Sequence, residues 1–71
     1  MSEEDIRQLE KEVKKTKRLA SEQAMELHDL IEDRLPEAYG ELLGIANATY
    51  VACKNWDEAN KKLLAAQAEL A

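Results

Sequence analysis

A helical repeat runs through almost the whole chain and is interrupted once, at the only proline, Pro36. Proline has no backbone N–H, and its ring disfavours helical backbone at the preceding Leu35, so a helix that reaches this point has to end. Pro36 itself suits the first turn of a new helix. The sequence therefore predicts two helices, at about 3–33 and 36–70, whose short connection makes them antiparallel.

In the first predicted helix, apolar and small residues recur at alternating intervals of three and four, which keeps them on one face. This row of the first predicted helix consists of Ile6, Leu9, Val13, Thr16, Ala20, Gln23, Leu27 and Leu30. Leu19, Ala24 and Ile31 widen the face beyond a narrow stripe, which favours packing in a bundle. Ser2, which precedes three acids, is a suitable N-cap.

The same spacing predicts a core row in the second helix, namely Tyr39, Leu42, Ala46, Thr49, Cys53, Trp56, Asn60, Leu63, Gln67 and Leu70. A flanking row of mostly small residues accompanies it, namely Ala38, Ile45, Ala52, Ala59 and Ala66. Folding about position 35 pairs Leu30 with Tyr39, Leu27 with Leu42, Ala20 with Thr49, Val13 with Trp56 and Ile6 with Leu63. This matching predicts an all-α, antiparallel two-helix hairpin as a single domain over 1–71.

A chain of 71 residues buries little apolar surface, and its lone Cys and lone His exclude an internal disulfide and a zinc-finger spacing. A single hairpin also leaves half of its broad apolar face in water. We therefore expect the hairpin to dimerise into a four-helix bundle, as a homodimer or a higher homo-oligomer.

No apolar run approaches the roughly 18 residues that a membrane span needs, and the acidic N-terminal residues do not resemble a signal peptide. With its single thiol, the chain is expected to be a soluble cytoplasmic protein. Its 15 acidic and 10 basic residues give a net charge of −5, which disfavours sequence-independent binding of nucleic acid.

Charge is distributed unevenly along the chain. Residues 11–18 carry five basic residues against one acid, and residues 22–41 carry seven acids against Arg34. Two interpretations stay open: solvated helix faces, or an acidic end that binds a basic partner or a cation. The candidate partner-binding residues at that end are Asp29, Asp33, Glu37 and Glu41.

His28, the only histidine, lies at the edge of the predicted hairpin core. Glu32 follows at i+4, so the two side chains can bind a divalent cation together, whereas Asp29 is expected to point about 100° away. Two ligands do not complete a site, and a second chain, water or a partner would have to add to it. The alternative is a surface or interface histidine that pairs with Glu32.

Cys53 is expected to fill the core, because a buried thiol behaves as a small apolar group and no base is placed to activate it. Trp56 is expected to anchor the core or a contact between chains. Gly40 and Gly44 mark either a close backbone approach or a soft helix end. Polar residues on the two core rows are expected to set the register.

The run from Met25 to Glu32 has the pattern Met-x-Leu-His-Asp-Leu-x-Glu, followed by Leu35-Pro36 and later by Ala46-x-x-Thr49-Tyr50. In these motifs the chain resembles the small Rop-like proteins encoded among nitrogen-fixation genes, a family known as a domain of unknown function. It departs from the pattern in three places: Arg34 is an extra residue before Leu35-Pro36, Ile31 stands where Ala is common, and Gly is more frequent after Pro36.

The resemblance implies a helical hairpin that dimerises, and a non-enzymatic accessory role in which the protein binds a nitrogenase component or assembly factor. It also implies metal binding by the His-containing helix, which falls here on His28 with Glu32 as the neighbouring carboxylate. The alternative function is thus a small carrier or sensor of Ni, Zn or Fe. A third and weaker hypothesis is an RNA-binding bundle that uses Lys11, Lys14, Lys15, Lys17 and Arg18.

Overall fold

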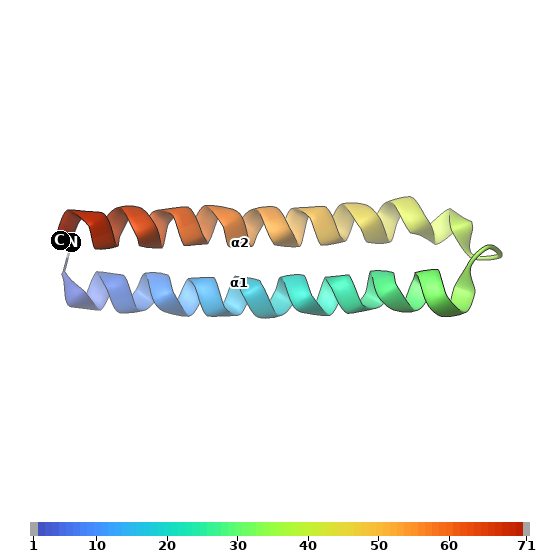
Figure 1. The fold of residues 1–71 in the computed structure, drawn as a ribbon, viewed down its shortest axis with the longest axis horizontal. Coiled ribbons are helices and arrows are strands. Elements are labelled where there is room, and N and C mark those ends of the chain that lie inside the picture. Colours follow the sequence, from blue (N-terminus) through green and yellow to red (C-terminus); the bar gives the residue numbers. More distant parts are fainter. Residues whose placement is uncertain (1, 71) are drawn as a thin grey trace.

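The computed structural model describes residues 2–70. Helix α1 spans Glu3–Asp29 and continues into a π-helical segment, η1 (Leu30–Arg34). After a turn at residues 35–38, a short 3₁₀ helix, η2 (Tyr39–Glu41), leads into α2 (Leu42–Leu70). The two long helices lie side by side and antiparallel, in a rod of 52 × 14 × 13 Å (Figure 1). The predicted all-α hairpin is confirmed.

The start of α1 has the cap that its first residues predict. The backbone N–H of Asp5 donates to the hydroxyl of Ser2, and the backbone N–H of Ser2 donates to the carboxylate of Asp5, both at 3.3 Å. This capping box satisfies two backbone donors that a helix start leaves free. Glu3, Glu4 and Asp5 add negative charge where the helix dipole favours it.

The first helix ends where the proline requires it. Leu35 has extended backbone (φ −89°, ψ 148°), as a residue before proline prefers, and its N–H closes the last π-helical turn on Leu30 at 3.1 Å. The Leu35–Pro36 peptide bond is cis.

The second helix begins later than predicted, at Leu42 and not at Pro36. Between these residues the N–H of Tyr39 donates to the carbonyl of Pro36, and the N–H of Glu41 donates to that of Ala38. Both bonds span three residues, so they form tight turns and no α-helical ladder. Ala38, with φ −90° and ψ 26°, separates the turn from η2.

The predicted α1 row is confirmed as the face that packs on α2, because all eight of its residues are buried or half-buried. Leu30 is the most enclosed, with 0% of its surface exposed. The residues expected to widen this face, namely Leu19, Ala24 and Ile31, are exposed. The packed face of α1 is therefore narrower than the sequence suggested.

The predicted core row of α2 is correct at the six positions that are half-buried, namely Leu42, Ala46, Thr49, Trp56, Asn60 and Leu63, and wrong at the other four. Ala52, Ala59 and Ala66 of the flanking row are covered, whereas Cys53, Gln67, Tyr39 and Leu70 are exposed. An alanine lets the α1 backbone approach closely enough for the larger α1 side chains to fill the space between the helices. The expectation of a core cysteine is thus corrected: Cys53 is exposed.

The register of the hairpin also differs from the prediction. The hydroxyl of Thr49 donates to the backbone carbonyl of Gln23 at 3.2 Å, whereas Ala20 was the predicted neighbour. The midpoint between residues 23 and 49 is Pro36, so the hairpin folds one residue later than expected. The shift arises because the turn and η2 occupy residues 35–41 before α2 begins.

Candidate functional site

His28 lies on the exposed surface of α1 between two carboxylates. Its Nε2 lies 3.6 Å from Oε1 of Glu32, and its Nδ1 lies 3.6 Å from Oδ1 of Asp29. The expected proximity of Glu32 to the ring is confirmed, whereas the expectation that Asp29 points away from it is wrong. Helical spacing fixes the direction of Cβ, but the flexible Asp29 carboxylate, which is 61% exposed, bends back toward the ring.

These three groups do not form a complete metal site within one chain. Asp29 and Glu32 face opposite nitrogens of the ring, so their oxygens do not converge on one point. Within residues 2–70 the structure contains no group of three His, Cys, Asp or Glu side chains that is able to hold a metal ion. Metal binding at His28 would need ligands from another molecule.

The four predicted partner-binding acids all lie on the exposed surface at the turn end of the rod. Arg34 binds one of them: its guanidinium lies 3.2 Å from the Glu41 carboxylate and joins η1 to η2. Within the described residues Asp33 and Glu37 form no ion pair, and the Asp29 carboxylate lies 3.6 Å from Nδ1 of His28. The turn end therefore presents a net negative surface.

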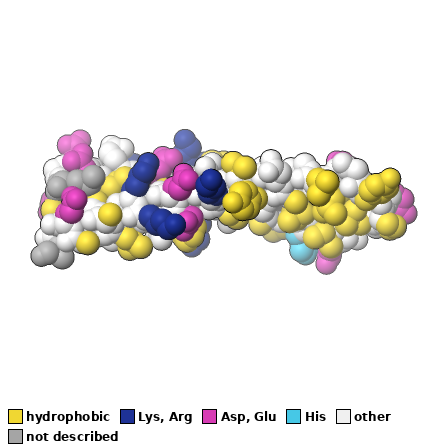
Figure 2. All heavy atoms as spheres, turned by 90° about the horizontal axis from the view of Figure 1, so that it is seen from above, with side chains coloured by type: hydrophobic (Ala, Val, Ile, Leu, Met, Phe, Trp, Pro, Cys, Tyr) yellow, Lys and Arg dark blue, Asp and Glu magenta, His cyan; other side chains and the backbone are white. Residues whose placement is uncertain are grey.

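Large apolar side chains gather beside this acidic surface, which the sequence interpretation did not foresee. The exposed fractions are 75% for Tyr39 in η2, and 82% for Leu43 and 66% for Tyr50 in α2. The spacing of seven residues places Leu43 and Tyr50 on one side of α2. Figure 2 shows hydrophobic atoms over the turn half of the rod, with the histidine at their edge and most Lys and Arg toward the other half. The sequence does contain one indication of this exposed apolar cluster, because Leu43 is a leucine that lies outside both predicted rows.

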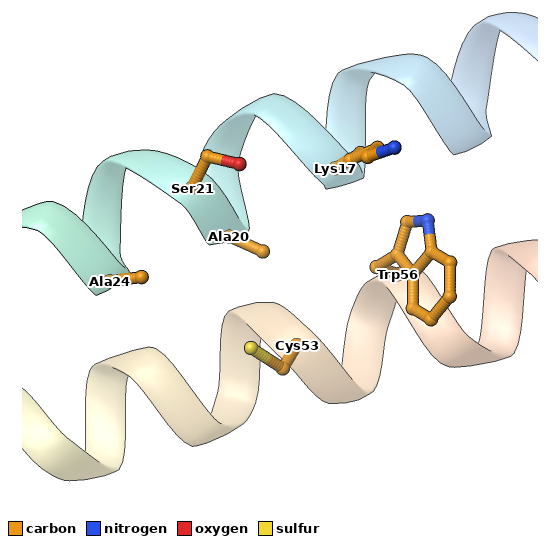
Figure 3. A pocket seen from close by; sticks show the side chains of 6 residues that line it. All are labelled: Lys17, Ala20, Ser21, Ala24, Cys53 and Trp56. Atoms are coloured by element: carbon orange, nitrogen blue, oxygen red, sulfur yellow. The ribbon is translucent and has the colours of Figure 1, made fainter.

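Two adjoining shallow grooves run along one side of the hairpin. The first, of about 300 Å³, is lined by Lys17, Ala20, Ser21, Ala24, Cys53 and Trp56 (Figure 3). The second, of about 330 Å³, is lined by Ser21, Ala24, Met25 and His28, and so shares Ser21 and Ala24 with the first. Trp56 is half-buried, and its indole N–H is enclosed with no hydrogen-bond acceptor among the described residues.

Gly40 and Gly44 have no role within the hairpin that requires glycine. Neither has a positive φ, and a Cβ atom added at either position would meet nothing within 4 Å. Turn geometry and close packing against α1 are therefore both excluded as reasons for them. Gly40 lies in η2 and Gly44 near the start of α2, and both are exposed.

The half of the rod nearer the termini carries most of the basic residues, and two of them form ion pairs along one helix. Arg18 binds Glu22 at 3.1 Å, and Lys61 binds Asp57 at 2.9 Å. The hydrogen bond that the Lys61 ammonium donates to Asp57, and the negative charge of Asp57, raise the pKa of Lys61 above its usual value of 10.5. These are exposed i to i+4 pairs of the kind that solvated helices form.

None of the helices within residues 2–70 is long and apolar enough to cross a membrane.

Comparison with known proteins adds the following. The profile of the Rop-like family matches residues 4–68. A UPF0437 protein of Azorhizobium caulinodans is 41% identical over 59 residues, which cover 83% of this chain and 84% of that protein. No solved structure matches the chain. With the profile matched over nearly its whole length, and with a two-helix hairpin as its fold, this chain belongs to the Rop-like family.

Proposed function

We propose that this chain is a non-enzymatic accessory protein of nitrogenase in the cytoplasm, which works as a homodimer and docks on a nitrogenase component or assembly factor. The observation that carries the proposal is the turn end, where exposed acids lie beside exposed apolar side chains. Such a combination is typical of a surface that binds another protein, because the apolar groups supply affinity and the charges supply orientation.

The motif around His28 supports the choice of nitrogenase, because in this motif the chain resembles Rop-like proteins encoded among nitrogen-fixation genes. The small number of buried apolar residues supports the homodimer. Among the described residues only Ile6, Leu30, Ala59 and Ala66 are buried apolar residues, so a second hairpin would cover much of what one leaves exposed.

Co-purification from nitrogen-fixing cells tests the docking. A nitrogenase component or assembly factor is expected to be recovered with the tagged wild-type protein, and to be recovered less with the double variant Asp29→Asn/Asp33→Asn. The matched control is Glu3→Gln/Glu4→Gln, which removes the same charge at the far end of the rod. Failure to recover such a protein with the wild type, or equal losses in both variants, would contradict the docking surface.

A second candidate function is a metal carrier or sensor, and the 3.6 Å approach of Glu32 to the His28 ring favours it. His28 and Glu32 would supply two ligands for Ni, Zn or Fe, and a second molecule would complete the coordination. Calorimetric titration of Ni²⁺ or Zn²⁺ into the wild type and His28→Ala tests this. Equal binding by the two proteins would remove His28 from the site.

A further inference from the structure

The basic residues of the hairpin gather in one belt within the half of the rod nearer the termini (Figure 2). The contact between Thr49 and Gln23 places residues whose numbers sum to 72 side by side, as 23 and 49 do, so residues 7–18 of α1 lie along residues 54–65 of α2. These two segments form a basic belt about 18 Å long. They carry nine of the ten basic residues of the chain and four acids, a net charge of +5.

Acidic zones bound this belt on both sides. Glu3, Glu4 and Asp5 precede it in the first turn of α1. Beyond it, residues 19–53, which include the turn, carry seven acids and one base. The belt therefore attracts an anionic group, whereas the acids on either side repel any part of that group that extends past the belt.

Within the belt, four cations form a straight row along α1. This cation row consists of Arg7, Lys11, Lys14 and Arg18. The intervals of four, three and four residues keep the row on one face of the helix, over a length of about 16.5 Å. All four side chains are exposed.

The cation row lies opposite the face of α1 that packs on α2. Each of its members precedes a residue of the packed row by two positions, as Lys11 precedes Val13 and Lys14 precedes Thr16. Two positions correspond to about 200° around the helix. Val13 is half-buried and Thr16 is buried, so the cations are directed to the other side, away from α2.

The charges of the row are largely unneutralised within the hairpin. Among the described residues only the last member, Arg18, forms an ion pair, with Glu22 at 3.1 Å. The two acids of the same stretch, Glu10 and Glu12, line separate shallow grooves beside the row. Three of the four cations thus remain available to a ligand.

We propose that the cation row binds a short acidic helix of a partner protein, whose carboxylates recur at the same intervals of four, three and four residues. Each carboxylate then meets one cation. An antiparallel orientation also suits the two helix dipoles. Exposed ion pairs are individually weak and are screened by salt, so the contact is modest in affinity and depends on ionic strength. It uses none of the residues of the turn end and does not depend on the homodimer.

A nucleic acid is a poorer match for the same row. Its phosphates recur about every 3.4 Å along each strand and continue past the belt, so a strand laid along the rod meets the acids on both sides. The only aromatic residue of the belt, Trp56, is half-buried, whereas base stacking needs an exposed ring. The net charge of −5 adds a general repulsion.

Binding of a designed peptide tests the proposal. The probe is a labelled helical peptide of roughly 20 residues with four glutamates in such a row, and fluorescence anisotropy at low ionic strength measures its binding to the full chain. Lys11→Glu/Lys14→Glu is expected to bind it about tenfold more weakly than the wild type. A peptide with lysine at the two central row positions is expected to reverse this preference.

Lys61→Glu/Lys62→Glu is the matched control. It makes the same change of charge at the same level of the rod, since residue 61 lies beside residue 11, but on the other helix. This variant should bind the glutamate peptide nearly as well as the wild type. A peptide with the same glutamates in scrambled order, which no longer form a row, should bind the wild type less tightly.

Equal losses in the two double variants, or equal binding of the scrambled peptide, would overturn the cation row as the site. Tighter binding of a short RNA duplex than of the peptide, in the same buffer, would overturn the assignment to a protein helix. Sedimentation of the chain alone would overturn it too if the wild type associated and Lys11→Glu/Lys14→Glu did not, because a second copy would then occupy the row. Circular dichroism checks that each variant keeps its helix content. Docking of nitrogenase is measured separately, by co-purification with the Asp29 and Asp33 variants.

Discussion

The hydroxyl of Thr49 on α2 donates a hydrogen bond to the backbone carbonyl of Gln23 on α1, at 3.2 Å, and so ties the two helices in one register. The same hydroxyl lies 2.9 Å from the carbonyl of Ile45 in its own helix. Thr16, the buried threonine of α1, bonds only within α1, to the carbonyls of Glu12 and Val13. The two threonines thus differ in the one bond that crosses between the helices.

Replacement of Thr49 by Val keeps the shape of the side chain and removes the bond that crosses to α1. It is expected to lower the free energy of unfolding by about 0.5–1.5 kcal/mol. Thr16→Val is the control, and it should cost less because the hydroxyl it removes bonds only within its own helix. Urea unfolding at one fixed protein concentration measures both, and equal losses would show that the interhelix bond adds no stability.

Leu30 is the most completely buried large side chain, at the point where α1 passes into η1. Leu30→Ala is expected to lower the free energy of unfolding by about 2–5 kcal/mol, because it leaves a cavity between the helices next to the turn. Leu43→Ala makes the same chemical change at a side chain that is 82% exposed and should cost under about 0.5 kcal/mol in dilute, monomeric protein. Thermal or urea unfolding compares them, and a small effect of Leu30→Ala would contradict its place in the core.

Gly44→Ala is expected to stabilise the hairpin. Since the backbone at Gly44 suits any residue and an added Cβ meets nothing, the hairpin should gain about 0.5–1 kcal/mol from the better helix former. Urea unfolding in dilute solution measures the change, and a loss of stability would contradict the open space beside Gly44.

The capping box at Ser2 predicts a local effect. Ser2→Ala removes the side-chain acceptor for the Asp5 N–H and is expected to cost about 0.5–1 kcal/mol, with fraying of the first turn of α1. Ser21→Ala, in the middle of α1, removes a hydroxyl at an exposed position without a cap and should be neutral or slightly stabilising. Amide hydrogen exchange over the first helical turn distinguishes a lost cap from a general loss of stability.

Much of the fold was predictable because the responsible forces are local. Pro36 ends the first helix whatever surrounds it, and the three-and-four spacing of α1 identifies its packed face at all eight positions. At the site, the pairing of His28 with Glu32 followed from helical spacing. The contact of Asp29 with the other ring nitrogen did not, because a short flexible carboxylate is directed by its neighbours and not by the helix alone.

In the second helix, the periodicity of the sequence alone does not identify which positions are buried. Cys53 and Ala52 are adjacent, each of a size that fits a core position, and the repeat admits either. Only the packing against α1 decides that Ala52 is covered and that Cys53 is exposed, because the approach of two helices depends on side chains from both. The same holds for the exposed Tyr39, which periodicity alone placed in the core.

By itself, the sequence determined that this chain forms two helices, where the first one ends and which of its faces is apolar, since backbone sterics and periodicity act within a few residues. The tertiary structure decided the register, through a turn that carries η2 and delays α2 until Leu42. It also decided which apolar residues stay outside, and so placed an uncharged surface beside the acids of the turn. That surface results from the summed packing of two helices, and among its residues only Leu43, which lies outside both predicted rows, indicated it locally.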